Sequence, residues 1–74
     1  MQGWAWETRI GTFRIVERAD GFHVEFEDEH LDGPFRSAQH ALDDLAGGHT
    51  PWPASGADPS TLGLSDDLSD WAQL

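Results

Sequence analysis

Two of the four histidines lie in a short polar stretch whose residue types can bind metal ions. His23, Glu25 and Glu27 alternate along the chain, and His30 follows three residues after Glu27. If residues 22–27 form a straight strand, alternate side chains share one face, and a returning strand places His30 opposite Glu27. Imidazole nitrogens and carboxylate oxygens are ligands for divalent cations. We therefore consider a metal site of His23, Glu25, Glu27 and His30, with a solvated charged face as the alternative.

Motifs for catalysis and cofactor binding are missing from the chain. There is no His-Glu-x-x-His pair, no EF-hand loop, no glycine-rich phosphate loop and no serine elbow. Since the chain has no cysteine, it has neither disulfides nor a thiol nucleophile. General acid–base catalysis needs carboxylates or histidines in a desolvated cleft, for which a small sheet with one helix has little room. We expect a protein that is not an enzyme and holds no cofactor.

The charge of the chain is strongly one-sided. Fourteen acidic residues stand against four arginines and no lysine, for a net charge of −10, and residues 37–74 contain six acids and no base. Such a field repels phosphate backbones and anionic lipid surfaces, and it attracts cationic partners. The sequence therefore predicts a small protein-interaction or regulatory module with a basic protein partner, and it argues against nucleic acid or membrane as the partner.

The candidate contact residues for such a partner are clustered acids and two apolar residues near the C-terminus. They are Glu25, Glu27, Asp28, Glu29, Asp32, Asp43, Asp44, Leu68 and Trp71. Three alternatives stay open. The exposed histidines and glutamates bind a metal or a small ligand, the acids imitate a nucleic-acid backbone, or Arg9, Arg14 and Arg18 bind nucleic acid directly through the sheet face.

Apolar residues alternate with polar ones over residues 4–35, a pattern typical of half-buried antiparallel strands. We place two-residue turns at Ile10-Gly11 and Asp20-Gly21, because Asp-Gly is a strong hairpin signal. A turn near Asp28-Glu29 then starts a weaker fourth strand, whose Gly-Pro pair favours a sheet edge. The predicted cross-strand pairs are Trp6 with Ile15, Thr8 with Phe13, Ile15 with Phe26, Phe26 with Leu31, Phe22 with Phe35, and Arg14 with both Glu7 and Glu27.

A single helix follows the strands. Ser37 suits its N-cap, and Gly47 suits a left-handed C-cap. Small and apolar residues at helical spacing form one stripe for the aromatic face of the sheet: Ala38, Ala41, Leu42 and Leu45. The predicted fold class is α+β, an antiparallel three- to four-stranded meander packed on one α-helix, with an ordered C-terminal arm.

The last third of the chain lacks periodicity but holds several large apolar residues. We expect residues 1–48 to form the sheet-plus-helix core and residues 49–74 to form an arm packed on the same single domain. In this interpretation the arm completes the core, with Trp52 held between two prolines. The alternative is a short exposed motif from Leu68 to Trp71.

The chain shows no sign of membrane insertion or export. No apolar run approaches the roughly 20 residues of a membrane span, and the first residues lack a basic patch followed by an apolar stretch. We therefore expect a cytoplasmic protein. The absence of Lys, Asn, Tyr and Cys, together with frequent Ala, Gly and Asp, is typical of a GC-rich bacterial genome.

Two resemblances to known proteins add to these expectations. The core GTFRIVERADGFHVEFEDEHLDGPFRSAQHALDDLAGG and the ending LSDDLSDW resemble small bacterial conserved hypothetical proteins, a resemblance that implies no activity. A meander followed by GPFRSAQHALDDLA is similar in order to phage-integrase arm domains and to a plant class of DNA-binding domains. Those domains read DNA with basic and aromatic residues on the exposed sheet face. Here three arginines interleave with three glutamates on that face, which argues against DNA binding.

Overall fold

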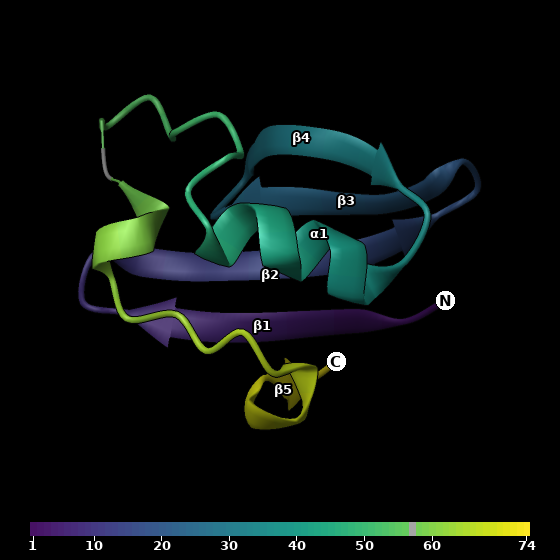
Figure 1. The fold of residues 1–74 in the computed structure, drawn as a ribbon. Coiled ribbons are helices and arrows are strands. Elements are labelled where there is room, and N and C mark those ends of the chain that lie inside the picture. Colours follow the sequence, from purple (N-terminus) through teal and green to yellow (C-terminus); the bar gives the residue numbers. More distant parts are fainter. Residues whose placement is uncertain (57) are drawn as a thin grey trace.

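The computed structural model describes residues 1–56 and 58–74, and within these ranges five antiparallel strands form one sheet (Figure 1). The strands stand in the order β4-β3-β2-β1-β5. The elements in chain order are β1 (Gly3–Thr8), β2 (Gly11–Arg18), β3 (Gly21–Phe26), β4 (Glu29–Phe35), the helix α1 (Ala38–Ala46), the 3₁₀ turns η1 (Pro59–Thr61) and η2 (Leu68–Asp70), and β5 (Ala72–Gln73).

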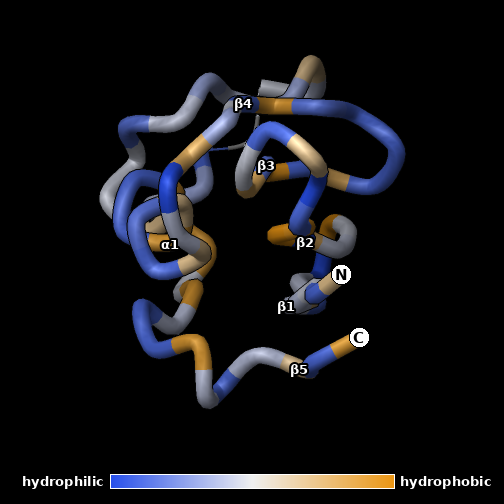
Figure 2. The backbone as a smooth tube through the Cα atoms, turned by 90° about the vertical axis from the view of Figure 1, so that its right-hand side faces the viewer, coloured by the Kyte–Doolittle hydropathy of each residue, from blue (hydrophilic) through white to orange (hydrophobic). Residues whose placement is uncertain are grey.

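The predicted α+β fold is confirmed, and the four-stranded meander gains one short strand. Helix α1 and the C-terminal segment lie on one face of the sheet, and the opposite face is bare of other described elements (Figures 1 and 2). The fifth strand pairs antiparallel with β1 through Trp4↔Gln73 and Ala5↔Ala72. No helix in the described residues has the length and apolar character that a membrane crossing requires.

Both predicted hairpin turns were placed one residue too late. The strands end at Thr8 and Arg18 and resume at the glycines Gly11 and Gly21, so the turn residues precede each glycine. A Cβ on Gly11 would lie 2.6 Å from the Phe26 ring, and both glycines have positive φ values. These glycines therefore permit close packing at the strand starts, and the Asp-Gly hairpin signal was misassigned.

The register consequently differs from the prediction by two residues in each hairpin. The observed pairs are Trp6↔Phe13, Trp4↔Ile15, Ala5↔Arg14, Ile15↔Val24, Phe13↔Phe26 and Arg14↔Glu25. A slip of two residues keeps every side chain on its predicted face, whereas a slip of one would exchange the faces. The prediction that the aromatic residues share the core face therefore survives the wrong pairing.

Strand β4 is irregular, and the prediction for it was half right. Phe35 lies opposite Phe22 as predicted, but Phe26 pairs with Glu29 and not with Leu31. The register of β3 and β4 shifts between the Phe22↔Phe35 pair and the Phe26↔Glu29 pair. These shifts mark a β-bulge in β4, the strand that contains Gly33. Leu31 is nevertheless buried in the core.

The helix forms as its sequence predicts at the start and along its apolar face. The Ser37 hydroxyl accepts a hydrogen bond from the His40 backbone N–H at 3.0 Å, and the predicted stripe is fully buried. The end differs from the prediction, because Gly47 has right-handed dihedrals and Gly48, at φ 77°, is the residue in the left-handed region. The helix therefore carries the left-handed turn one residue later than expected.

The C-terminal segment completes the core. The Trp71 side chain is 4% exposed, its ring lies 5.8 Å from the Trp6 ring, and its indole N–H donates to the Ser65 carbonyl at 2.9 Å. Leu68 is half-buried against the same cluster. Trp52 differs from the expectation, since it is 53% exposed. An exposed motif from Leu68 to Trp71 is therefore not what the arm presents, because its tryptophan lies in the core.

We predict that the arm is essential to stability through Trp71. Trp71→Ala should lower the free energy of unfolding by about 3–5 kcal/mol, the usual loss for truncating a buried tryptophan. Trp71→Phe should lose roughly 1–3 kcal/mol and stay folded. Urea unfolding monitored by circular dichroism measures both values. Trp52→Ala is the matched control, and a loss from it as large as that from Trp71→Ala would contradict the assignment of Trp71 to the core.

Candidate functional site

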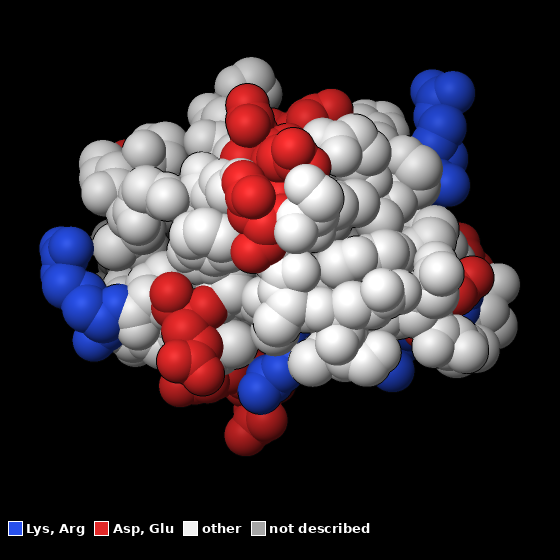
Figure 3. Space-filling model, turned by 90° about the horizontal axis from the view of Figure 1, so that it is seen from below, with Lys and Arg blue, Asp and Glu red and all other residues white. Residues whose placement is uncertain are grey.

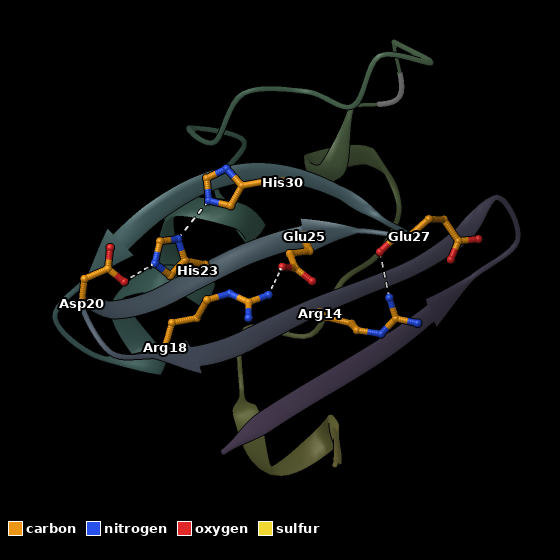
Figure 4. A network of polar contacts seen from close by, with 7 residues as sticks. All are labelled: Arg14, Arg18, Asp20, His23, Glu25, Glu27 and His30. Carbon is orange, nitrogen blue, oxygen red and sulfur yellow. Dashed lines mark hydrogen bonds and ion pairs between the residues drawn. The ribbon is translucent and has the colours of Figure 1, made fainter. Parts of the chain in front are cut away.

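Two histidines meet on the face of the sheet that the helix does not cover. His23 on β3 points its Nδ1 at Nε2 of His30 on β4, at 2.9 Å, and its Nε2 lies 2.7 Å from the Asp20 carboxylate (Figure 4). The two rings lie 5.1 Å apart and tilted. The sequence predicted that these histidines lie near each other, but it did not include Asp20. Asp20 belongs to the turn before β3 in the predicted and in the observed register, and the direction in which a turn side chain points is not fixed by strand alternation.

The backbone of β4 holds the His23 ring in place. His23 is only 8% exposed, although it lies on the uncovered face. A Cβ on Gly33 would lie 2.6 Å from His23 Nδ1 and 2.9 Å from its Cγ, so the Gly33 backbone packs directly against the ring. The glycine that made β4 look like a poor strand is therefore the residue that makes room for His23.

The hydrogen bonds determine which nitrogen of His23 is free to act. The bond from His23 lowers the pKa of the Asp20 carboxyl below its ordinary value, although desolvation opposes the shift. An ionised carboxylate only accepts hydrogen bonds, so His23 Nε2 carries the proton in this contact. In a neutral His23 ring, the lone pair then lies on Nδ1, which faces His30.

The two glutamates of the predicted metal site are engaged elsewhere. Glu25 lies 2.6 Å from the Arg18 guanidinium, and it is Glu25 that stands opposite His30, not Glu27 as predicted. Glu27 begins the β3–β4 turn at φ 52°, and its carbonyl accepts from Arg14 at 2.8 Å (Figure 4). Among the described residues, no group of three or more His, Cys, Asp or Glu side chains is placed to hold a metal ion. The structure therefore brings His23 and His30 together but does not group them with Glu25 and Glu27.

The acids proposed as partner contacts fall into separate groups. Near the β3–β4 turn, Asp28 is exposed, while both oxygens of Glu29 accept from the Ala54 backbone N–H at 3.1 Å and tie the arm to β4. Asp32 accepts from the backbone N–H of the residue after it. Glu29 and Asp32 therefore contribute to local structure, and of these three only Asp28 shows no such bond within the described residues.

A second acidic group joins the helix to the C-terminal segment. The Gln39 amide donates to the Asp43 carboxylate at 2.8 Å and to the Asp66 carbonyl at 3.1 Å, while Asp44 lies 4.0 Å from His40. Acidic side chains gather in separate patches on the surface seen from below, with uncharged surface between them (Figure 3). Gln39 thus links Asp43 to the backbone of the last segment, while Asp44 contacts His40 on its own helix.

A groove at the outer edge of β1 was missed by the sequence reasoning. It encloses about 470 Å³ between β1 and the last residues, and it is lined by Ala5, Trp6, Glu7, Thr12, Asp70, Ala72 and Leu74. Its floor includes small and apolar side chains, and Glu7 and Asp70 supply negative charge. No pattern in the sequence predicts that a two-residue strand at the C-terminus pairs with β1. That pairing is set by Trp71, which draws the chain back to the sheet.

The wall of the groove is held by a capped turn. Asp67 accepts from the backbone N–H of Ser69 at 2.9 Å and from its hydroxyl at 2.8 Å, and these bonds lower the pKa of the Asp67 carboxyl. Asp70, which lines the groove, accepts from the Ser65 hydroxyl at 2.6 Å. The turn η2 is therefore organised by its own side chains, which fixes where Asp70 stands.

Comparisons with known proteins give no further guide: no family model matches the chain, and no significant match appears among curated proteins or solved structures. The two resemblances drawn from the sequence accordingly stay predictions. The candidate sites must therefore be judged on their own geometry.

We predict that Gly33 is required for the position of His23. Gly33→Ala should lower the free energy of unfolding by about 1–3 kcal/mol, because φ is 139° and the added Cβ meets the ring. Gly63→Ala is the matched control, since φ is also positive (70°) there but nothing lies within 4 Å of the added Cβ. Urea unfolding of both variants makes the comparison. Equal losses would show that the contact with His23 contributes nothing.

We predict a pH-dependent contribution of Asp67. Because its pKa is lowered from 3.8 on folding, the ionised carboxylate stabilises the protein above that pH, and the benefit is lost as the pH falls through the lower folded value. Asp67→Ala should therefore lower the thermal midpoint at pH 7, and the difference from the unsubstituted protein should shrink below pH 3.8. Asp66→Ala removes the same charge from a carboxylate that makes no hydrogen bond within the described residues. An equal, pH-independent effect of both variants would contradict the prediction.

Proposed function

We propose that the protein is a small non-enzymatic binding module that accepts an extended, basic segment of a protein partner at the free edge of β1. The observation that carries this proposal is the position of the groove. It lies where the outermost long strand of the sheet runs on without a partner among the described residues, and two carboxylates line it.

The edge of β1 is only partly covered. Its pairing with β5 stops at Ala5↔Ala72, and the Leu74 backbone N–H donates to the Gly3 carbonyl at 2.8 Å. In an antiparallel ladder, alternate residues direct their backbone groups to the same neighbour. Gly3, Ala5 and Glu7 therefore face this edge, and Glu7 is the residue past the end of β5. Addition of an extended peptide to such an edge is an established mode of recognition.

The charge of the site favours a cationic occupant. Glu7 and Asp70 line the groove, and the nearest arginine in the register, Arg14 opposite Ala5, donates to the Glu27 carbonyl. The chain as a whole carries −10. A second copy of the chain would bring like charges together at the same edge, which disfavours self-pairing. Lysine or arginine side chains that alternate with aliphatic ones would meet both the carboxylates and the apolar floor.

Two other partners fit the arrangement less well. On the uncovered face Arg18 is paired with the Glu25 carboxylate and Arg14 donates to the Glu27 backbone carbonyl. The net charge of −10 also repels a phosphate backbone. Imitation of a nucleic-acid backbone needs a continuous row of acids. The acids seen from below stand instead in separate patches (Figure 3). A short basic peptide matches such patches better than a protein built to bind a phosphate chain.

We predict that an alternating Val–Lys peptide binds the groove. Titration into isotopically labelled protein should shift backbone amide signals of residues 6–8 and 70–74, while an alternating Val–Glu peptide should shift none. Glu7→Gln combined with Asp70→Asn should weaken the binding about fivefold to tenfold, because two exposed ion pairs at about 0.5–0.7 kcal/mol each sum to about 1–1.4 kcal/mol. Asp28→Asn combined with Asp44→Asn removes the same charge elsewhere and should leave the affinity nearly unchanged.

The outcomes separate edge pairing from general attraction. A Val–Lys peptide with N-methylated backbone amides keeps its charge but cannot pair with an edge, so it should bind at least tenfold more weakly. Equal binding of the methylated peptide, or equal loss in both double variants, would reduce the interaction to unspecific electrostatics and overturn the proposal. A dimer in sedimentation analysis without peptide would assign the edge to a second copy of the chain and overturn it as well.

A further inference from the structure

We propose that His23 and His30 form a two-imidazole binding site for a first-row divalent cation such as Zn²⁺ or Ni²⁺, with Asp20 as the carboxylate that orients His23. The site lies on the β3–β4 side of the uncovered face and is separate from the groove at β1. The site keeps the two histidines of the set that the sequence suggested. It leaves out both glutamates and includes Asp20 instead.

The two facing nitrogens are close to the separation that a shared cation requires. Two ligands at about 2.0–2.1 Å from a tetrahedral Zn²⁺ stand about 3.3 Å apart. His23 Nδ1 and His30 Nε2 lie 2.9 Å apart. Joint coordination would therefore take a movement of about 0.4 Å, a turn of the His30 ring that directs both lone pairs at the cation, and transfer of the proton on His30 Nε2 to its own Nδ1 or to water. His30 is the residue that would move, because it is exposed, whereas His23 is buried among its neighbours.

His23 is oriented in the manner of a metal-ligating histidine. Such histidines typically donate their second ring N–H to a carboxylate or carbonyl, which fixes the ring and makes the coordinating nitrogen more basic. Asp20 provides this contact at His23 Nε2, and the Gly33 backbone packs against the ring beside Nδ1 and Cγ, which leaves the direction of His30 as the open approach to Nδ1. The result is a His23 ring whose Nδ1 lone pair points at His30. Histidines on an ordinary solvated face of a sheet would not need this orientation.

The surroundings also favour a cation. Asp20 lies on one side, and Glu25 stands opposite His30 across the strand pair, although Arg18 binds its carboxylate. The site supplies two protein ligands, so the remaining coordination positions stay open to water. Imidazole nitrogen suits Zn²⁺, Ni²⁺ and Cu²⁺ better than Ca²⁺ or Mg²⁺, which take oxygen ligands. The chemistry therefore selects transition metals and excludes the hard cations.

Titration calorimetry of the full chain without any affinity tag tests this site, with Zn²⁺ and Ni²⁺ as the probes and Mg²⁺ as the negative control. We expect one equivalent of Zn²⁺ or Ni²⁺ to bind and Mg²⁺ to give no heat. His30→Ala should weaken binding at least tenfold, since it removes one of two ligands from an exposed position that folding does not need. Asp20→Asn should weaken it about 10- to 100-fold through the loss of the orienting carboxylate.

His40→Ala and His49→Ala are the matched controls, because both remove an exposed histidine outside the pair. Both should bind as the unsubstituted protein does. In a parallel experiment, paramagnetic Ni²⁺ should broaden the ring signals of His23 and His30 and spare those of the control histidines. Undiminished binding by His30→Ala, or loss of binding in either control, would overturn the proposed ligands. Undiminished binding by Asp20→Asn would overturn the role of Asp20.

Discussion

Burial of the aromatic side chains on a single face of the sheet is the constraint on which the rest of the structure depends. A chain of 74 residues without cysteine must build its core from a few large side chains. Phe13, Phe26 and Trp71 are buried there, and α1 closes the core with two leucines and two alanines. Because that face is fully used, polar chemistry is left to the opposite face and to the edges of the sheet.

The alternation of side chains between the two faces of each strand made the core residues predictable, although the register was not. Alternation places side chains on one face or the other, and an error of two residues does not change the face. The turn positions were mistaken because a glycine before a strand reads as a turn residue, whereas Gly11 and Gly21 serve close packing against Phe26 and Phe35. A glycine in such a sequence pattern marks a position where a side chain is not tolerated. Whether a turn or a close contact excludes the side chain is seen only in the packed structure.

The candidate sites were predictable to different degrees for the same physical reason. His23 and His30 belong to adjacent strands of a meander, so a local pattern brings them together, and only the exact partner across the strands was wrong. The third member, Asp20, lies in the turn before β3, where the alternation of strand side chains no longer says which way a side chain points. The groove depends on β5, which pairs with the first strand of the chain from its far end. Such a contact has no local signal, because it follows from the burial of Trp71.

The order of the strands keeps the two proposed sites apart. His23 and His30 lie on β3 and β4, while the groove follows β1, and β2 stands between them. Neighbouring strands are about 4.8 Å apart, so two spacings separate β3 from β1 by about 10 Å. Substitutions at two sites that far apart, without shared partners, usually change the free energy of unfolding nearly independently. Arg14 and Arg18 on β2 each donate to a group on the β3 side, so neither hydrogen bond links the histidine pair to the groove. The proposed cation site over β3 and β4 and the proposed peptide groove at β1 therefore rest on different residues of the same sheet, and neither proposal needs the other.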